Sequence, residues 1–401
     1  MKQKHESLSR RDIAGNVSAT TMHNASTTRR DAMHCVSSVW TKTVLCLFFV
    51  MATIAANAQF SGSGSGTLVD PYLITSDTEL EEVRNDLTAF YRLDADITVN
   101  AWIPFGTFTG NFDGNGHTVT ISSLGAVPLS GTTYFVGLFG ELGSSGSIRN
   151  LKVEGTLGFS ENGANSIHIG GIVGRNNGGT IQNCVSTAGI TVSGDAVSAI
   201  DAGGIVGYNS IGTIANCYSL SNVSADNTGS SPTGRSNAGG VVGASNATIS
   251  ACYATGSVHA TSTSSTNNMS GGISGLLSPG TIANCVALNA GITIKAGDTS
   301  IGRIAGYLSG TSTNNRAIAI SSLPNGTLTD KNGLLITSAQ AQTQTTYATD
   351  AGWAFGATDT DPWVWSPGLL RPVLYWETYA VTFSVTGGNG QGRRIKISSV
   401  Q

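Results

Sequence analysis

The sequence predicts an all-β protein built as a parallel β-helix, with a short capping helix before it and an aromatic cap after it. Three observations predict this class: the 401 residues include 52 glycines, only 11% of residues are charged, and one glycine-rich phrase recurs through the middle of the chain. About 25% of residues are charged in typical soluble domains, so this composition argues against a coiled coil, a disordered acidic tail and a helical enzyme. Its glycine, serine, threonine and asparagine suit many short strands joined by turns.

The first residues predict an export signal, with residues 1–58 as the signal peptide. Residues 43–56 form one short apolar run between Lys42 and the small-x-small triplet Ala56-Asn57-Ala58. A membrane-spanning helix needs roughly 18 to 20 apolar residues, more than this run supplies, so cleavage after Ala58 is favoured over a membrane anchor. The stretch before the run is long for a signal peptide, which makes Met33 an alternative start.

The chain that remains after cleavage is acidic. Residues 1–58 hold 7 of the 21 Lys and Arg residues and 3 of the 24 Asp and Glu residues, which leaves 14 bases, 21 acids and a net charge of about −7. Outside the last residues, no basic cluster offers the footprint that phosphate backbones require, and no later stretch reaches transmembrane length. We therefore expect no nucleic-acid partner, no transmembrane segment after signal cleavage, and a protein that is secreted, extracellular or on the outer cell surface.

Residues 59–133 predict an N-terminal cap and the first strands. Ser76 and Glu79 are spaced as a capping box, and a short helix after them would place three apolar residues on one face: Leu80, Val83 and Leu87. Three β-prone stretches follow at 90–99, 106–112 and 117–122, the last two joined by the turn sequence at 113–116. A cap is needed because an open β-helix exposes unpaired edges at its ends.

Residues 134–320 contain the repeat. Its closing glycines recur at nearly even spacing, at Gly140, Gly174, Gly207, Gly243, Gly275 and Gly306. A second phrase follows the first five copies and begins at Ile148, Ile181, Ile214, Ile249 and Ile282. Two coupled phrases at one period are typical of a solenoid, in which each repeat buries its apolar face against the next.

Each repeat predicts one triangular coil of three short strands. The second repeat illustrates them with GGIVG, TIQNCVS and GITVSG, separated by Gly, Asn and Ser turns, and no segment is long enough for a helix. The length variation falls after the third stretch, in segments such as 222–237 and 260–269. We expect these insertions to form loops on one side.

The same register predicts two structural ladders. Four asparagines recur at one position, where we expect an inward-facing amide ladder with Ala251 as its gap: Asn150, Asn183, Asn216 and Asn284. Four cysteines recur with the same period: Cys184, Cys217, Cys252 and Cys285. Parallel neighbours hold their Cβ atoms about 4.8 Å apart, beyond the roughly 3.5 to 4.5 Å of a relaxed disulfide, which favours a buried thiol stack over disulfides.

These two phrases, GG(I/V)(V/S)G followed by IxNC(V/Y), resemble the GLUG repeat of bacterial exported surface proteins, including those that flank some immunoglobulin-cleaving metallopeptidases. The resemblance covers about residues 134–310, departs at Ala251, Arg303 and Ala305, and extends to the leader phrases DPYLI, WIPFG and FDGNGHTV. It implies a right-handed parallel β-helix (solenoid) at cell surfaces, adhesin-like, and implies no conserved catalytic residue.

Residues 321–378 predict a C-terminal cap. Residues 338–347 suit a weak helix, and a cluster of Trp and Phe residues follows: Trp353, Phe355, Trp363, Trp365 and Trp376. Such a cluster could be a sugar-stacking platform, but a plug of large rings over the end of the rod is favoured. Residues 379–388 resemble the first strand of an internalin-type β-grasp repeat, so 379–401 would be a partial β-repeat of a truncated or frameshifted chain.

Candidate catalytic chemistry is sparse. A polysaccharide lyase or glycoside hydrolase on the β-helix scaffold would need clustered acids, and it predicts that Asp195, Asp201 and Asp226 converge. A calcium site at Asp94, Asp96 and Asp113 competes with a plain polar strand face. The histidines after residue 58, which are His117, His168 and His259, are widely separated in sequence and offer no zinc or Ser-His-Asp arrangement. We therefore expect no catalytic residue, no metal and no cofactor.

The favoured function is a non-catalytic, adhesin-like β-helix whose loops bind a glycan or an extracellular host or matrix protein. The cleaving enzyme described above is the alternative, and a third hypothesis is a stalk from a larger surface protein. The sequence does not identify the binding residues, because the loops are generic in composition.

Overall fold

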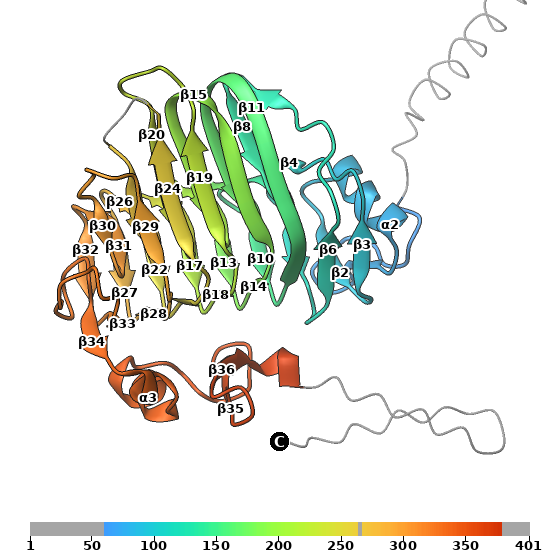
Figure 1. Cartoon of the computed structure of the whole chain (residues 1–401). Coiled ribbons are helices and arrows are strands. Elements are labelled where there is room, and N and C mark those ends of the chain that lie inside the picture. The colour runs from blue at the N-terminus through green and yellow to red at the C-terminus, as the bar shows by residue number, and fades with distance from the viewer. Residues whose placement is uncertain (1–59, 264–266, 379–401) are drawn as a thin grey trace, which may run out of the picture. The chain divides into compact units, whose positions relative to one another are not determined.

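The structure is a computed structural model that describes residues 60–263 and 267–378 (Figure 1). All of them belong to one compact unit that begins at residue 59. The expected signal peptide at 1–58 and the expected partial repeat at 379–401 lie outside the described residues.

The chain winds into stacked coils, as the repeat predicts. Equivalent residues one repeat apart pair in parallel register, as the aligned isoleucines show: Ile148 with Ile181, Ile181 with Ile214, Ile214 with Ile249, and Ile249 with Ile282. Each buries its side chain completely in the interior of the coil. The predicted parallel β-helix is therefore confirmed.

Two faces of the rod are single parallel sheets. The nine-stranded sheet runs in the order β1 (Tyr72–Ile74), β2 (Phe90–Leu93), β5 (Asn111–Asp113), β10 (Ser147–Arg149), β13 (Thr180–Gln182), β17 (Thr213–Ala215), β22 (Thr248–Ser250), β27 (Thr281–Ala283) and β32 (Thr311–Thr313). The seven-stranded sheet comprises β4 (Phe105–Phe108), β9 (Phe139–Leu142), β12 (Val173–Asn176), β16 (Val206–Asn209), β21 (Val242–Ser245), β26 (Ser274–Leu277) and β31 (Ala305–Leu308).

The remaining strands form two further faces that share the long strand β11 (Lys152–Gly170). The flank sheet also contains β3 (Ile97–Val99), β6 (Thr118–Ile121), β14 (Val185–Ser186), β18 (Tyr218–Ser219), β23 (Tyr253–Ala254), β28 (Val286–Ala287), β33 (Arg316–Ile318) and β34 (Leu334–Ile336). The loop sheet also contains β7 (Leu129–Ser130), β8 (Thr133–Val136), β15 (Gly189–Gly203), β19 (Val223–Asn227), β20 (Arg235–Gly239), β24 (Val258–Ser262), β25 (Met269–Gly271), β29 (Ile292–Ile294) and β30 (Ile301–Gly302).

The insertions fall between the same two strand positions in successive coils. The connection between β19 and β20 spans residues 228–234, and the one between β24 and β25 follows Ser262 and ends before Met269. Because β19 pairs with β24 and β20 pairs with β25 in parallel register, the described ends of both connections lie on one side of the rod, as expected from the repeat lengths (Figure 1). Each is shorter than the sequence interval that predicts it, because the ends of the intervals 222–237 and 260–269 are strands.

A bend divides the predicted second stretch of each coil. In TIQNCVS, β13 ends at Gln182 and β14 begins at Val185, with Asn183 at φ +54° between them. Only glycine, and to a lesser degree asparagine, adopts this left-handed conformation at small cost. The repeated asparagine is therefore a corner residue, and the stretch that was predicted as one strand is two strands in each of these coils.

The predicted capping helix is α2 (Asp77–Glu82), continued by a 3₁₀ turn at Val83–Asn85. Its N-cap Ser76 accepts a hydrogen bond from the Glu79 N–H at 3.3 Å, and the Glu79 carboxylate accepts from the Thr75 N–H. Leu80 and Val83 are fully buried against the first coil. The helix therefore adds apolar bulk to the N-terminal part of the core.

A loop within 321–333 covers the last coil. Its Lys331 carbonyl accepts hydrogen bonds from the N–H groups of Ile304 and Ala305, and the buried Arg303 donates through Nε to the Asn332 carbonyl at 3.1 Å. Arg303, a departure from the repeat pattern, thus binds the loop that covers the end of the rod.

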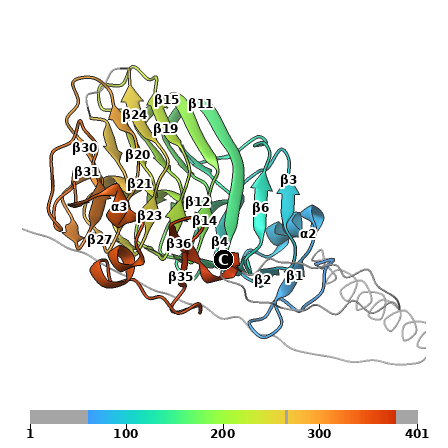
Figure 2. The ribbon, with the colours of Figure 1, turned by 60° about the horizontal axis from the view of Figure 1, so that its bottom comes forward.

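The C-terminal strap, residues 338–378, lies elsewhere than expected. It contains α3 (Ser338–Ala341), a π-helical turn at Thr346–Asp350, the antiparallel pair β35 (Trp363–Ser366) and β36 (Arg371–Leu374), and a 3₁₀ turn at Tyr375–Thr378. Its aromatic residues do not plug the end of the rod but pack on the outer side of the flank sheet (Figures 1 and 2). The described residues therefore form two apolar cores, one inside the coils and one beneath the strap.

Candidate functional site

The four repeated cysteines lie inside the coils. All are completely buried with free thiols, and each donates toward a nearby backbone carbonyl, as Cys184 Sγ does to the Gln182 oxygen at 3.1 Å. Burial raises the pKa of the Cys217 and Cys285 thiols well above the usual range. Because the thiolate is the reactive form, burial leaves Cys217 and Cys285 as small, unreactive core residues.

The repeated asparagines lie at the left-handed corner between the nine-stranded and flank sheets. Asn150, Asn183, Asn216 and Asn284 have φ between +52° and +56°, and Ala251 has φ +49° at the same position. Several of these corners bind the strap: Asn183 Nδ2 donates to the Asp359 carbonyl at 3.0 Å, and the Asn284 carbonyl accepts from Trp353 Nε1 at 2.6 Å. This differs from the expected inward amide ladder, because the left-handed backbone turns these groups toward the strap.

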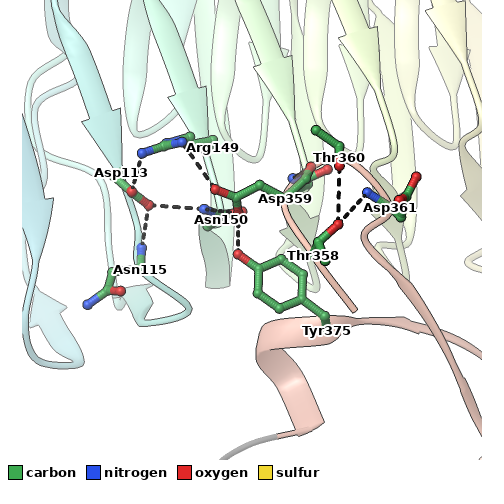
Figure 3. Close-up of polar contacts among 10 residues, drawn as sticks. Asp113, Asn115, Arg149, Asn150, Thr358, Asp359, Thr360, Asp361 and Tyr375 are labelled. Atoms are coloured by element: carbon green, nitrogen blue, oxygen red, sulfur yellow. Dashed lines mark hydrogen bonds and ion pairs between the residues drawn. The ribbon is translucent and has the colours of Figure 1, made fainter. Parts of the chain in front are cut away.

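The far end of the strap is held by a polar latch (Figure 3). Arg149 bridges two carboxylates, with Nη2 2.8 Å from Asp113 Oδ2 and Nη1 3.4 Å from Asp359 Oδ2. Asn150 Nδ2 also donates to Asp113 and Asp359, and the Tyr375 hydroxyl donates to Asp359. The single charge of Arg149 offsets one of the two acids, and both carboxylates also accept hydrogen bonds from neutral donors, so we interpret the latch as a structural contact between strap and rod.

The aromatic strap residues pack against one another and against the rod. Trp353 and Trp363 stack with ring centroids 4.4 Å apart, and Trp363 lies 5.9 Å from Tyr253 of β23. Trp363 is fully buried and Trp353 is 4% exposed. These two rings offer no face to a sugar, whereas Phe355, Trp365 and Trp376 of the same cluster are half-buried.

Two of the three candidate acids are neighbours, and the third lies apart. Asp226 pairs in register with Ser193, which places it diagonally across from Asp195 on the neighbouring strand, whereas Asp201 lies in a separate buried network. Asp94, Asp96 and Asp113 each pair with a basic residue, respectively Arg92, His117 and Arg149. Within 60–263 and 267–378, no group of three His, Cys, Asp or Glu residues is arranged to hold a metal ion. Among the described residues, the three acids of the calcium alternative therefore form no metal site.

The closing glycines create a tight corner between the loop sheet and the seven-stranded sheet. A Cβ atom on Gly207 would lie 2.4 Å from the Ile169 nitrogen, and one on Gly174 would lie 2.5 Å from the Val136 nitrogen. Only glycine allows the two backbones to approach this closely. At this corner, therefore, the residues that precede the phrase in one coil lie against the residues that follow the phrase in the next coil.

Two rows of outward side chains meet at this corner. One row lies two residues before the phrase and consists of Phe135, His168, Asp201, Asn237 and Met269. The other follows the closing glycine and includes Thr107, Glu141, Arg175, Tyr208, Ala244, Leu276 and Tyr307. We call these the corner rows; they touch where the His168 and Tyr208 rings lie 5.1 Å apart and where the Arg175 guanidinium lies 5.7 Å from the Phe135 ring.

The corner rows contain a His-Asp pair that sequence inspection did not reveal. His168 Nδ1 lies 2.8 Å from Asp201 Oδ2, and Asn237 Nδ2 donates to Asp201 Oδ1 at 2.6 Å. His168 is 9% exposed, Asp201 2% and Asn237 0%. His168 and Asp201 pair in register one repeat apart, so the period itself could have identified the pair.

A second polar group lies beside it. Arg175 Nη1 is 3.5 Å from Glu141 Oε2, and Asn177 contacts both side chains at 3.4 and 3.5 Å. The Tyr208 hydroxyl accepts from Asn246 Nδ2 at 2.7 Å. Phe135, Glu141, Arg175 and Tyr208 are half-buried, so rings and hydrogen-bonding groups share one accessible surface. Such mixed surfaces bind ligands that have both apolar and hydroxyl-bearing sides.

No helix in the described part of the chain has the length and apolar character needed to cross a membrane.

Comparisons with known proteins support the fold but do not identify an activity. No protein-family model matches the chain, so membership of the GLUG group stays a prediction. The chain is 31% identical over 154 residues to a "Putative Gly-rich membrane protein" of Evansella cellulosilytica, which covers 33% of this chain and 17% of that protein. It is 32% identical over 137 residues to halomucin of Haloquadratum walsbyi, covering 29% of this chain and 1% of that protein.

A solved structure extends over more of the chain. The crystal structure of a "putative immunoglobulin A1 protease" from Bacteroides ovatus matches with a TM-score of 0.55 at 22% identity, covering 78% of this chain and 94% of that one. Identity at this level shows a shared fold alone. The chain spans less than a fifth of either curated relative. Taken together, the coils and these similarities show that the chain is a β-solenoid. It resembles a part of each of two larger proteins, one named a Gly-rich membrane protein and the other halomucin.

Proposed function

We propose that this protein is an exported surface β-helix that binds a glycan or an extracellular host or matrix protein without cleaving it. One observation carries the proposal: the insertions of successive coils emerge between the same two strand positions, from a rod with a continuous apolar core. A rigid scaffold that holds variable loops on one side is a recurrent arrangement for binding.

The cell-surface location has separate support. One relative is named a membrane protein and the other halomucin, and both are similar to about a third of this chain. The apolar run at 43–56 adds an export signal in the sequence. Extracellular glycans and matrix proteins are the partners that such a location makes available.

The test is a binding array of glycans and matrix proteins, with mass spectrometry of every polymer that is bound. Binding without new products supports the proposal. A reproducible cleavage product would overturn the non-catalytic part of it, and the absence of any binding would overturn the rest.

A further inference from the structure

We propose that the corner rows, rather than the loops, form the principal binding site of this protein, and that its ligand is an uncharged glycan. The inference rests on the proposed binding function and assigns it a place and a ligand class. The residues that carry it are Phe135, Glu141, His168, Arg175 and Tyr208.

The first argument comes from the aromatic rings of the corner rows. Phe135 and His168 lie on neighbouring strands with ring centroids 5.7 Å apart and 14° between their planes, and Tyr208 joins them across the corner. Pyranose rings have apolar C–H faces that contact aromatic side chains in concave, mixed surfaces. Phe135 and Tyr208 are only half-buried, although they are large rings in the middle of the rod.

The second argument comes from the hydrogen-bonding side chains beside these rings. The contacts among Glu141, Arg175 and Asn177 measure 3.4 to 3.5 Å, at the long limit of hydrogen bonding. Their side chains therefore keep capacity for shorter bonds. A planar carboxylate, guanidinium and amide match the paired donors and acceptors of adjacent sugar hydroxyls.

The third argument is rigidity. Tyr208 is held by Asn246, and His168 by Asp201, which Asn237 holds in turn. Groups fixed in this way lose little side-chain freedom when a ligand binds. Residues 228–234, by contrast, form an irregular connection outside the strands.

Charge selects the ligand class. Glu141 and Arg175 form one ion pair, and the buried Asp201 is paired with His168, so the site offers no unpaired cation to an anionic sugar. The chain after residue 58 is itself acidic, at about −7. A uronate or sulfate group would approach Glu141 without a free counter-charge, whereas a neutral sugar would not be repelled.

The spacing also favours an oligosaccharide over a single sugar. Glu141, Arg175 and Tyr208, all half-buried, lie in register on successive strands, about 4.8 Å apart along the rod. A chain that lies along the corner rows would meet a new set of side chains at each coil.

The experiment compares the purified protein with two sets of variants on one array of neutral, uronate-bearing and sulfated glycans and matrix proteins. The corner set is Glu141→Gln, Tyr208→Phe and Phe135→Ala. The control set is Thr228→Ala with Thr233→Ala in the loop, and Thr248→Ala on the nine-stranded sheet, all exposed threonines. Thermal melting of each variant separates lost binding from lost folding, and the near-isosteric Glu141→Gln and Tyr208→Phe keep the test valid if Phe135→Ala unfolds.

The expected result is binding of neutral glycans that Glu141→Gln weakens about tenfold, as the loss of a charged hydrogen bond predicts, while the control variants leave it unchanged. Binding that the loop variants weaken and the corner variants do not would overturn the inference and leave the proposed function standing. Binding only to anionic glycans or to a matrix protein would do the same. A protein that binds nothing on the array would overturn both.

Discussion

Replacing Trp363 by alanine should detach the C-terminal strap while the rod stays folded. Trp363 is fully buried at the centre of the outer core, where it contacts Trp353, Tyr218 and Tyr253. None of these four rings belongs to the core inside the coils. The two cores can therefore open separately, as local unfolding units often do.

The magnitude follows from the environment of the ring. Truncating a buried Trp to alanine costs about 3–5 kcal/mol. The indole Nε1 of Trp363 is buried without a hydrogen-bond partner, so its removal returns about 1 kcal/mol and places the net loss near 3 kcal/mol. That loss raises the open-to-closed ratio of the strap about 100-fold, at about 1.4 kcal/mol for each factor of ten.

Native-state proteolysis measures this ratio, because cleavage follows the population of the open form when opening is fast. We expect fragments cut within 338–378 to form much faster in Trp363→Ala, while acrylamide quenching of Trp102, buried inside the rod, stays low. Trp365→Ala on the same strand is the matched control, because Trp365 is only half-buried and should cost less. Simultaneous loss of rod and strap in Trp363→Ala, or unchanged cleavage, would refute the separation of the two cores.

Three further predictions concern single positions. Ala251→Asn should raise the free energy of unfolding by about 0.5–1 kcal/mol in denaturant titration, because Ala251 occupies the left-handed corner at φ +49°, where asparagine is tolerated better; a loss of stability would count against the corner explanation. Gly207→Ala should destabilise by about 1–3 kcal/mol or more, since the new Cβ would lie 2.4 Å from the Ile169 nitrogen, whereas Gly189→Ala, with no atom within 4 Å, should be near neutral; equal melting temperatures would contradict this. Burial raises the pKa of the Glu377 carboxyl above its ordinary 4.5, so the folded strap binds this proton more tightly than the unfolded chain. Resistance of the strap to proteolysis should therefore fall as the pH rises from about 4.5 through the folded pKa, and Glu377→Gln should remove that dependence; an unchanged pH profile would contradict it.

The repeat period predicts well which residues of the same type touch in neighbouring coils. It predicts poorly which residues of different types touch there. Equivalent isoleucines stack as expected, because a parallel β-helix turns one repeat length into one neighbour. His168 and Asp201 are such neighbours, yet a search for repeated residues does not pair them, because they are of different types. Chemistry that depends on two repeats is therefore visible only when unlike residues are compared at the repeat spacing.

The strap could not be placed from sequence for a different reason. Trp353 reaches Asn284 and Trp376 reaches Asn183, contacts over long sequence separations that no periodicity encodes. The aromatic content predicted burial correctly, because large rings are rarely left in solvent. Which surface they cover depends on the flank sheet, where Tyr218 and Tyr253 expose rings that only a segment from outside the coils can cover.

The strap also limits how this protein can evolve by duplication. It runs against the order of the coils, meeting Asn314 at Asp350, Asn284 at Trp353, and both Asn183 and Asn150 at Asp359. One extra coil between Asn183 and Asn284 would separate these anchors by about 4.8 Å more, while the strap would keep its length. The length of the C-terminal strap thus fits one number of coils, and a rod that gains or loses a coil must change the length of its strap.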